Sequence, residues 1–121
     1  MLEIAHQVAL RVGEESLDVS ELGRLLRALE ADPRVGTAAQ ALGISYRGAW
    51  GKLVRAERLF GVALVERTKG HGSRLTEAGA ALAAASAGFE REAERRLAVH
   101  AARLDAALAS LRGSAERPLR L

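Results

Sequence analysis

The most constraining feature of this sequence is a long segment near its C-terminal end that contains almost nothing to stop a helix. Between Thr76 and Arg112 the only interruptions are Gly79 and Gly88, so the pattern predicts one helix of about 36 residues, roughly 54 Å long. Apolar side chains recur every three or four positions along it, and this stripe is longer than a small domain can cover. We therefore expect a second copy of the chain to pair with the helix. The expected interface residues are Leu82, Ala85, Phe89, Ala93, Leu97, His100, Leu104, Leu108 and Leu111.

The rest of the chain is small, and its composition favours helices. With 121 residues it can form one compact domain plus the long helix. Hydrophobic residues make up 49% of the chain but aromatic residues only 3%, so the core has to consist of closely packed Ala and Leu, as helices permit. The chain has no cysteine, no apolar run long enough to span a bilayer and no basic leader. We expect a cytoplasmic protein without a membrane anchor.

The first third of the sequence predicts a strand and a helix. Residues 6–12 alternate between apolar and other side chains, so we expect a short strand that Gly13 ends. Asp18, with Glu21 three positions later, fits a capping box at the start of a first helix. Leucines at helical spacing follow, and this helix is expected to end before Pro33.

Two further helices are predicted to follow with a very short turn between them. The second covers residues 35–42, and Gly43 can adopt the left-handed conformation that closes it. Ser45 is suited to begin the third helix, which Gly61 ends. Two helices joined in this way form a helix-turn-helix.

Residues 62–75 contain two strand-like segments around the glycine-rich turn TKGHGS, which predicts a small hairpin with a basic tip. The expected fold class is mainly α, a winged helix-turn-helix with a short N-terminal strand, a β-hairpin wing and a long C-terminal dimerisation helix. The expected boundaries place the winged domain at residues 1–75, the long helix at 76–112 and a hinge at 113–121.

Charge is distributed unevenly along the sequence, although the net charge is only +3. Residues 1–33 carry a net charge of −4, and residues 76–121 are nearly neutral. Residues 34–75, which we call the basic block, carry eight cations against two acids. Such a block favours a polyanion as partner, most simply nucleic acid. Charge alone leaves open that the block is only a solvated surface.

Two glycines in the third helix need an explanation, because each costs about 1 kcal/mol relative to Ala in a helix. Steps of 100° per residue from Ala49 as the centre of the buried face turn Arg47 and Gly51 outward. Arg47 lies near the N-terminus of the helix, where recognition helices contact bases, and Arg can donate two hydrogen bonds to guanine. We expect Gly51 to permit close approach to DNA and Gly48 to let the second helix cross tightly.

The only tyrosine and the only tryptophan, Tyr46 and Trp50, lie one turn apart in the same helix. Both can pack on a sugar or a thymine methyl group of DNA. Trp50 can equally well be half-buried against the hairpin, and Gly51 can be an ordinary surface glycine. The sequence leaves these alternatives open.

The segments TAAQALGIS, YRGAW and LFGVALVERTKGHGSRLTEAG resemble the N-terminal winged helix-turn-helix of LysR-type regulators, in which LTEAG follows a basic wing. GISYRGAW is more similar to the molybdate-responsive ModE-type domain, which also has a strand before its first helix. The likeness covers residues 6–112 and implies a transcriptional regulator that binds an inverted repeat in double-stranded DNA as a homodimer. The candidate DNA-binding residues are Thr37, Ser45, Tyr46, Arg47, Trp50, Gly51, Arg55, Arg58, Arg67, Lys69, His71 and Arg74.

The end of the chain resembles the hinge that precedes the effector domain of LysR-type regulators. Leu119, Arg120 and Leu121 alternate after Pro118, as at the start of a strand. We expect a longer regulator whose missing C-terminal domain binds a small effector, an oxyanion such as molybdate by the ModE likeness. A frayed natural tail is the alternative. No cofactor is expected in the 121 residues.

An enzymatic function is not expected. His6, His71 and His100 are far apart in sequence, on a strand, a hairpin tip and a helix, without the spacing of metal ligands. No nucleophile has a base nearby. The alternative from a different class is a helical module that dimerises and binds a protein, and RNA binding is a weaker third, since no aromatic platform on strands is evident. A nucleic-acid affinity that falls steeply with salt separates DNA binding from a protein-binding module.

Overall fold

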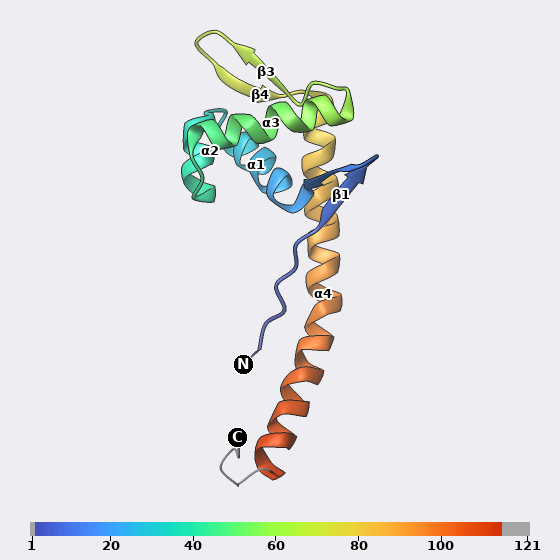
Figure 1. Ribbon diagram of the computed structural model, residues 1–121. Helices are drawn as coiled ribbons and strands as arrows, with labels where there is room; N and C mark the ends of the chain where they lie inside the picture. The colour runs from blue at the N-terminus through green and yellow to red at the C-terminus, as the bar shows by residue number, and fades with distance from the viewer. Residues whose placement is uncertain (1, 115–121) are drawn as a thin grey trace. The chain divides into compact units, whose positions relative to one another are not determined.

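The computed structural model in Figure 1 describes residues 2–114. Residues 7–89 form one compact unit, and residues 2–6 form a second with residues 90–114. The strand expected at residues 119–121 lies outside the described part of the chain.

The first unit begins with strands and continues with helices, as expected for a winged helix-turn-helix. Its two sheets are antiparallel pairs, β1 with β2 and β3 with β4. The tip of the β3–β4 hairpin, the wing, projects away from the helices (Figure 1). The elements are β1 (Ala9–Val12), β2 (Glu15–Asp18), α1 (Val19–Ala31), α2 (Val35–Leu42), α3 (Tyr46–Phe60), β3 (Val65–Thr68) and β4 (Gly72–Leu75).

The core of this unit consists of leucine and alanine, as the composition predicts. Leucines from α1 fill its centre, and Ala49, Leu53 and Ala56 of α3 belong to the same core cluster. The same core receives the first turns of α4, in which Ala83 is fully buried. Nearly unexposed residues of this core include Leu22, Leu25, Leu26, Leu29, Ala49, Leu53, Ala56 and Leu64.

The predicted N-terminal strand is one half of a hairpin. Gly13 (φ 64°) and Glu14 form a two-residue turn, and Val12 pairs with Glu15 across it. Gly13 therefore reverses the strand rather than ending it, as glycine does at the first position of a type II′ turn. The second strand was not predicted because three of its four residues are polar or charged, and only Leu17 is buried.

The predicted ends of the helices are confirmed. The carboxylate of Asp18 accepts a hydrogen bond from the backbone N–H of Glu21 (2.9 Å) at the start of α1. Gly43 (φ 70°) closes α2, and the hydroxyl of Ser45 accepts from the N–H of Gly48 (2.9 Å) at the start of α3. Glu21 does not complete a capping box, because its side chain is paired with Lys52.

The base of the wing is fixed to the helices by backbone hydrogen bonds. The N–H of Ser73 in β4 donates to the carbonyl of Pro33, between α1 and α2 (2.7 Å). The N–H of Thr76 donates to the carbonyl of Leu64 (3.0 Å), and the Thr76 hydroxyl accepts from the N–H of Gly79 (3.0 Å). Thr76 thus joins the wing to the first turn of α4, as the sequence predicted for a helix cap.

The long helix is confirmed as α4, Glu77–Ser114. The expected domain boundary lies at residue 75, whereas the contacts keep residues 76–89 with the first unit because these turns bury Ala83 and Ser86. In the second unit, the remainder of α4 is accompanied by residues 2–6, which we call the N-terminal arm. No helix within residues 2–114 is long and apolar enough to cross a membrane.

Candidate nucleic-acid interface

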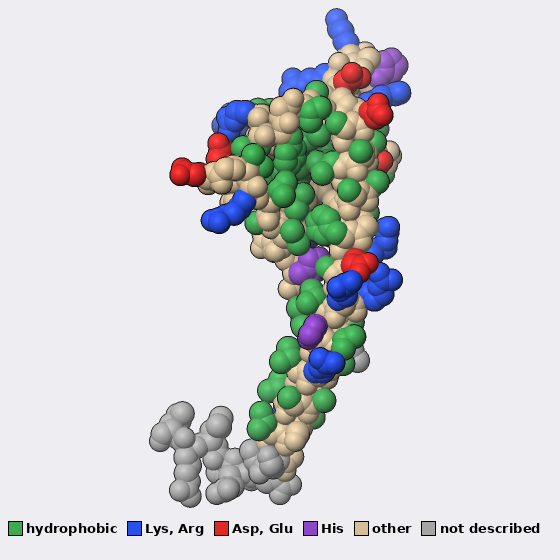
Figure 2. Space-filling model, turned by 90° about the vertical axis from the view of Figure 1, so that its right-hand side faces the viewer, with side chains coloured by type: hydrophobic (Ala, Val, Ile, Leu, Met, Phe, Trp, Pro, Cys, Tyr) green, Lys and Arg blue, Asp and Glu red, His purple; other side chains and the backbone are tan. Residues whose placement is uncertain are grey.

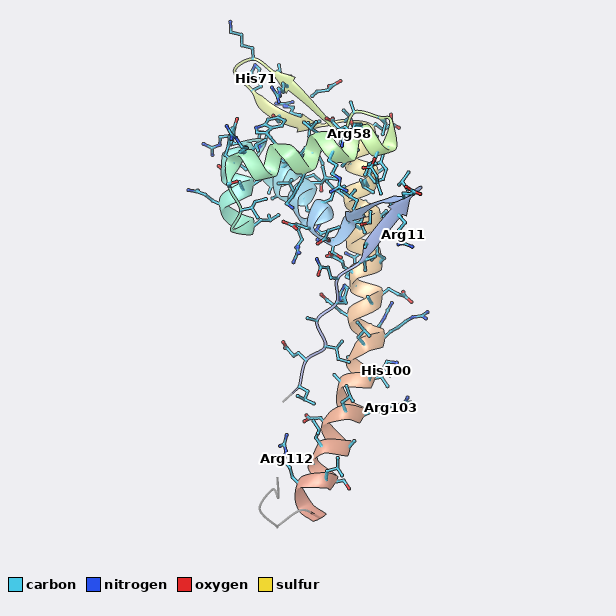
Figure 3. All side chains as sticks on the ribbon, in the orientation of Figure 1. Arg11, Arg58, His71, His100, Arg103 and Arg112 are labelled. Atoms are coloured by element: carbon cyan, nitrogen blue, oxygen red, sulfur yellow. The ribbon has the colours of Figure 1, made fainter. Side chains whose placement is uncertain are left out.

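The helix α3 has the orientation that its periodicity predicted. Ala49, Leu53 and Ala56 are fully buried, whereas Arg47 and Gly51 are exposed on the other side. Arg58 is also exposed and lies toward the C-terminal end of α3 (Figure 3). The exposed side of α3, with Arg47 near its N-terminus, is thus accessible to a partner.

The two glycines of α3 have different surroundings. A Cβ atom at Gly51 would find no other atom within 4 Å, so the backbone there faces open space. A Cβ atom at Gly48 would meet only the hydroxyl of Ser45, at 2.9 Å. The expectation that Gly48 permits a tight crossing of the second helix is therefore wrong. Glycine at this position instead leaves room for the Ser45 hydroxyl that caps α3.

Trp50 is half-buried, and the wing covers it. The guanidinium carbon of Arg67, in β3, lies 3.8 Å from the centre of the indole ring. The ring of Tyr46 meets the indole edge-on, with 6.4 Å between ring centres. The alternative in which Trp50 packs against the hairpin is thus confirmed, while Tyr46 remains largely exposed.

Three cations of the basic block are neutralised by acids from the N-terminal third of the chain. Lys52 lies 3.3 Å from Glu21. Arg55 lies 4.0 Å from Glu15 and donates to the carbonyl of Ser16 in β2 (2.7 Å). Arg55, a candidate DNA-binding residue, is therefore engaged with the N-terminal hairpin.

The third pair is formed by Asp32 and Arg34. Two guanidinium nitrogens of Arg34 donate to the two carboxylate oxygens of Asp32, at 2.8 and 2.9 Å. The hydrogen bond from Arg34 holds the pKa of Asp32 below its usual value, and the same contact raises the pKa of Arg34. Arg34 is thus committed within the chain.

The remaining cations of the basic block have no acidic partner within residues 2–114. Apart from Arg67 on Trp50, these are Arg47, Arg58, Lys69 and Arg74, all exposed. Glu66 lies directly opposite Arg74 in the wing, but no ion pair joins them in this part of the chain. The acidic N-terminal segment thus pairs with cations at the flank of the block, whereas Arg47 and Arg58 of α3 and the cations of the wing have no acidic partner in the described residues.

The other candidate residues lie around the same surface. Thr37 in α2 is exposed, and Tyr46 lies 3.9 Å from the position of a Cβ on Gly36, which places the start of α2 beside the start of α3. Ser45 lies at the turn between these helices. His71 is at the tip of the wing (Figure 3).

One contributor to this surface was missed. The carboxylate of Glu57 accepts from the N–H groups of Leu64 (2.8 Å) and Val65 (3.3 Å), which holds the start of β3 against α3. The sequence signal was an acid on the half-buried side of a basic helix, one turn before Gly61. This signal does not identify the partner, because the N–H groups that donate to Glu57 lie outside α3, at the start of β3.

The predicted interface residues of α4 fall into two groups. Leu82 packs against the core of the first unit, and Phe89 is half-buried. Farther along, Leu104, Leu108 and Leu111 are 52%, 38% and 61% exposed. Figure 2 shows hydrophobic side chains uncovered along the second half of α4.

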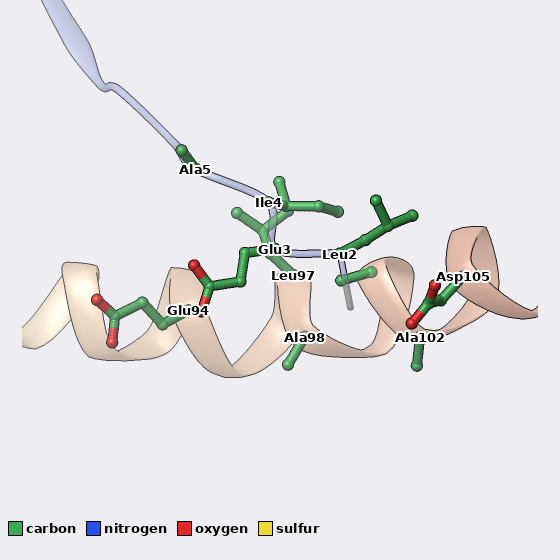
Figure 4. Close-up of a pocket in the computed structure, with 10 residues that line it drawn as sticks. Leu2, Glu3, Ile4, Ala5, Glu94, Leu97, Ala98, Ala102 and Asp105 are labelled. Carbon is green, nitrogen blue, oxygen red and sulfur yellow. The ribbon is translucent and has the colours of Figure 1, made fainter.

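The N-terminal arm covers part of the expected stripe. Leu2 and Ile4 lie over α4 near Leu97 (Figure 4), and Ala101 is buried beneath the arm, with 7% exposure. A groove of about 570 Å³ remains between arm and helix. This contact was missed, although the apolar residues at positions 2 and 4 were its signal. No group of three or more potential metal-ligating side chains occurs within residues 2–114.

The short turn between α2 and α3, the exposed basic face of α3 and the basic β3–β4 wing define a winged helix-turn-helix DNA-binding domain. Sequence comparison agrees with this class. Residues 23–80 match the lysR family of bacterial regulatory helix-turn-helix proteins. A comparison with curated proteins gives no match.

Solved structures of regulators are also similar to this chain. A probable transcriptional regulator from Pseudomonas aeruginosa is 32% identical, with a TM-score of 0.56 over 67% of this chain and 26% of its own. A mutant OxyR from Corynebacterium glutamicum is 28% identical, with a TM-score of 0.57 over 71% and 27%. The CbnR DNA-binding domain, solved in complex with DNA, is 25% identical, with a TM-score of 0.62 over 73% of this chain and 99% of its own.

The chain therefore spans about a quarter of the length of the first two regulators and nearly all of the third structure. Residues 23–80 thus match the lysR helix-turn-helix family, within a fold similar to that of a solved DNA-binding domain.

Proposed function

We propose that this chain binds an inverted repeat in double-stranded DNA as a homodimer, with α3 of each protomer in the major groove and the wing on the backbone or in the minor groove. The exposed face of α3 carries the proposal. Arg47 is uncompensated within the described residues, and one turn later Gly51 presents bare backbone to open space. A helix that has a free cation beside a bare stretch of backbone can approach base edges closely.

The homodimer is supported by α4. Leu104, Leu108 and Leu111 are three or four positions apart, so they lie on one face of the helix, and they remain exposed. A second α4 offers the same stripe, as a two-fold interface requires. Two protomers joined in this way carry two recognition helices, which fits a repeat with two-fold symmetry.

The N-terminal hairpin supports the likeness to ModE-type domains. β1 and β2 precede α1 and are attached to it by the hydrogen bond from Val19 N–H to the Val8 carbonyl (3.0 Å). By this likeness, an oxyanion such as molybdate is the proposed effector of the regulator. The 121 residues themselves are proposed to be non-enzymatic and to bind DNA without a cofactor, at an affinity that molybdate does not change.

The experiment is a selection of binding sites from a pool of random duplexes, followed by sequencing. The proposal predicts that two copies of one short motif are enriched in inverted orientation. In a selection with Arg47→Ala, one symmetric pair of base positions should lose its preference, at a cost of about 1–3 kcal/mol for that contact. Enrichment of no motif, or of an unpaired single motif, would contradict the proposed mode of binding.

A further inference from the structure

The wing contains two arginines that face in opposite directions. Directly opposite residues of an antiparallel pair lie on the same face, and successive residues alternate. Arg67 pairs with Ser73, which is buried, so both lie on the face toward the helices. Arg74 pairs with Glu66 on the other face. Arg67 and Arg74 therefore lie on opposite faces of the wing and do not point toward the same partner.

Arg67 is placed on the indole of Trp50 rather than toward solvent or an acid. Its guanidinium carbon is 3.8 Å from the ring centre, a distance at which a cation is attracted by the aromatic face. Trp50 is itself held in place, because it packs against the core and Tyr46 meets it edge-on. The indole is thus a fixed platform on α3, and Arg67 is the side chain that connects β3 to it.

The other strand of the wing has a separate attachment. The Ser73 N–H donates to the Pro33 carbonyl at 2.7 Å, and a Cβ atom at Gly72 would lie only 2.5 Å from the same oxygen. β4 is therefore fastened to the turn between α1 and α2, while β3 is fastened to α3 by Glu57 at its start and by Arg67 nearer the tip. Beyond these attachments lies the tip, with the exposed residues Lys69 and His71.

We propose that Arg67 is a positioning residue of the DNA-binding surface, which holds the wing in register with α3 through Trp50 and is not itself a phosphate contact. This inference rests on the proposed function. In the free protein the contact restricts the wing to the arrangement in which its tip and α3 face the same partner. Removal of the contact leaves the phosphate contacts of the complex unchanged, but the wing then has to be ordered on binding, which lowers affinity.

Salt dependence distinguishes this role from a direct contact. Each phosphate contact on duplex DNA contributes about 0.9 to the slope of log affinity against log salt concentration. Arg67→Met should weaken binding by roughly two- to fivefold, the equilibrium equivalent of an exposed cation–π contact, and should leave the slope unchanged. Lys69→Ala on the wing tip should reduce the slope by about 0.9 per protomer.

The test has three arms and uses the complete chain and a duplex that it binds. The first arm is the salt titration of the unchanged protein, Arg67→Met and Lys69→Ala. The second uses Trp50, the only tryptophan, as a fluorescent reporter without DNA. Arg67→Met should alter its emission, whereas Arg74→Met, the same change on the opposite face of the wing, should not. The third is a double-mutant cycle in which Arg67→Met has no further effect on affinity when Trp50→Leu is already present.

The outcomes separate this inference from the proposed function. If the unchanged protein does not bind duplex DNA, the proposed function fails. If it binds and Arg67→Met reduces the slope like Lys69→Ala, Arg67 is a phosphate contact and the inference is overturned. Unaltered Trp50 emission in Arg67→Met, or additive effects in the cycle, would also overturn it. If Trp50→Leu does not fold, the salt titration and the Trp50 emission still test the inference. Both use Arg67→Met, which should fold because Arg67 lies on an exposed part of the wing.

Discussion

Gly23 of α1 lies directly against Ser86 of α4, so closely that a Cβ atom on Gly23 would stand 2.6 Å from the Cβ atom of Ser86. The Ser86 hydroxyl accepts from the guanidinium of Arg27 (2.7 Å) and donates to the carbonyl of Ala83 (2.9 Å). The glycine thus permits α1 and the first turns of α4 to approach until a buried polar group is satisfied. This contact attaches the first turns of α4 to α1 within residues 7–89.

Gly23→Ala should destabilise the protein by about 1–3 kcal/mol, because the added methyl group forces the two helices apart. The matched control is Gly88→Ala in α4, where a Cβ atom meets nothing within 4 Å. The control should be neutral or more stable by up to about 1 kcal/mol. Urea unfolding followed by circular dichroism measures both, and equal stability of the two variants would show that the contact is not tight.

The cap of α1 gives a dependence of stability on pH. Partial burial raises the pKa of Asp18, but the backbone N–H of Glu21, the Gln7 amide and the charge of Arg24 together hold it below the ordinary value of 3.8. Since the pKa is lower in the folded state, the ionised carboxylate stabilises the fold above pH 4 or so, and this contribution is lost as pH falls through the folded-state pKa.

Asp18→Asn keeps an acceptor for the cap but removes the charge. The free energy of unfolding of the unchanged protein should exceed that of the variant at pH 6, and the difference should shrink as the pH is lowered below 4. Urea unfolding at a series of pH values checks this. A difference that does not change with pH would show that the charge of Asp18 does not contribute.

Helix ends and exposed faces could be predicted from sequence because they depend on local signals. Ser45 and Thr76 act as caps through hydrogen bonds to residues three positions away, and Gly43 has the backbone angle that only glycine adopts readily. The outward direction of Arg47 and Gly51 follows from helical periodicity alone. These local signals predicted the helix-turn-helix and the exposed face of α3.

The contacts that could not be predicted join residues far apart in the sequence. Arg55 binds the Ser16 carbonyl of the N-terminal hairpin, 39 positions away. The contact between Arg67 and Trp50 could not be predicted, because either side chain could equally well contact DNA. In each case the residue type allows several partners, and only the packing of the elements selects one.

Gly51→Ala should separate stability from binding. In the free protein the new methyl group meets no atom within 4 Å, so helix propensity should make the variant more stable by up to about 1 kcal/mol. At the DNA surface the same methyl group should prevent close approach and lower affinity by about tenfold, or ~1.4 kcal/mol. Thermal unfolding and fluorescence anisotropy measure the two effects, and unchanged DNA affinity would mean that Gly51 is an ordinary surface glycine.

Leu104→Glu combined with Leu111→Glu should convert the proposed dimer to monomers without unfolding the chain, because both side chains are more than half exposed. The matched control is Val99→Glu. Val99 is 53% exposed, like Leu104, but lies about 140° away from it around the helix. Sedimentation velocity at micromolar concentration should show dimers for the unchanged protein and the control. A monomeric unchanged protein would contradict pairing through α4.

The central claim is that the uncompensated cations of α3 and the wing bind duplex DNA, and the salt dependence of that binding tests it most directly. Arg58, Lys69 and Arg74 provide three candidate phosphate contacts per protomer, so a dimer should show a slope of log affinity against log salt concentration of roughly −5. The measurement is a fluorescence anisotropy titration of the selected duplex at several salt concentrations, with a scrambled duplex as control. The account predicts this steep slope and tighter binding to the selected duplex; an affinity that is flat with salt, or equal for both duplexes, would contradict it.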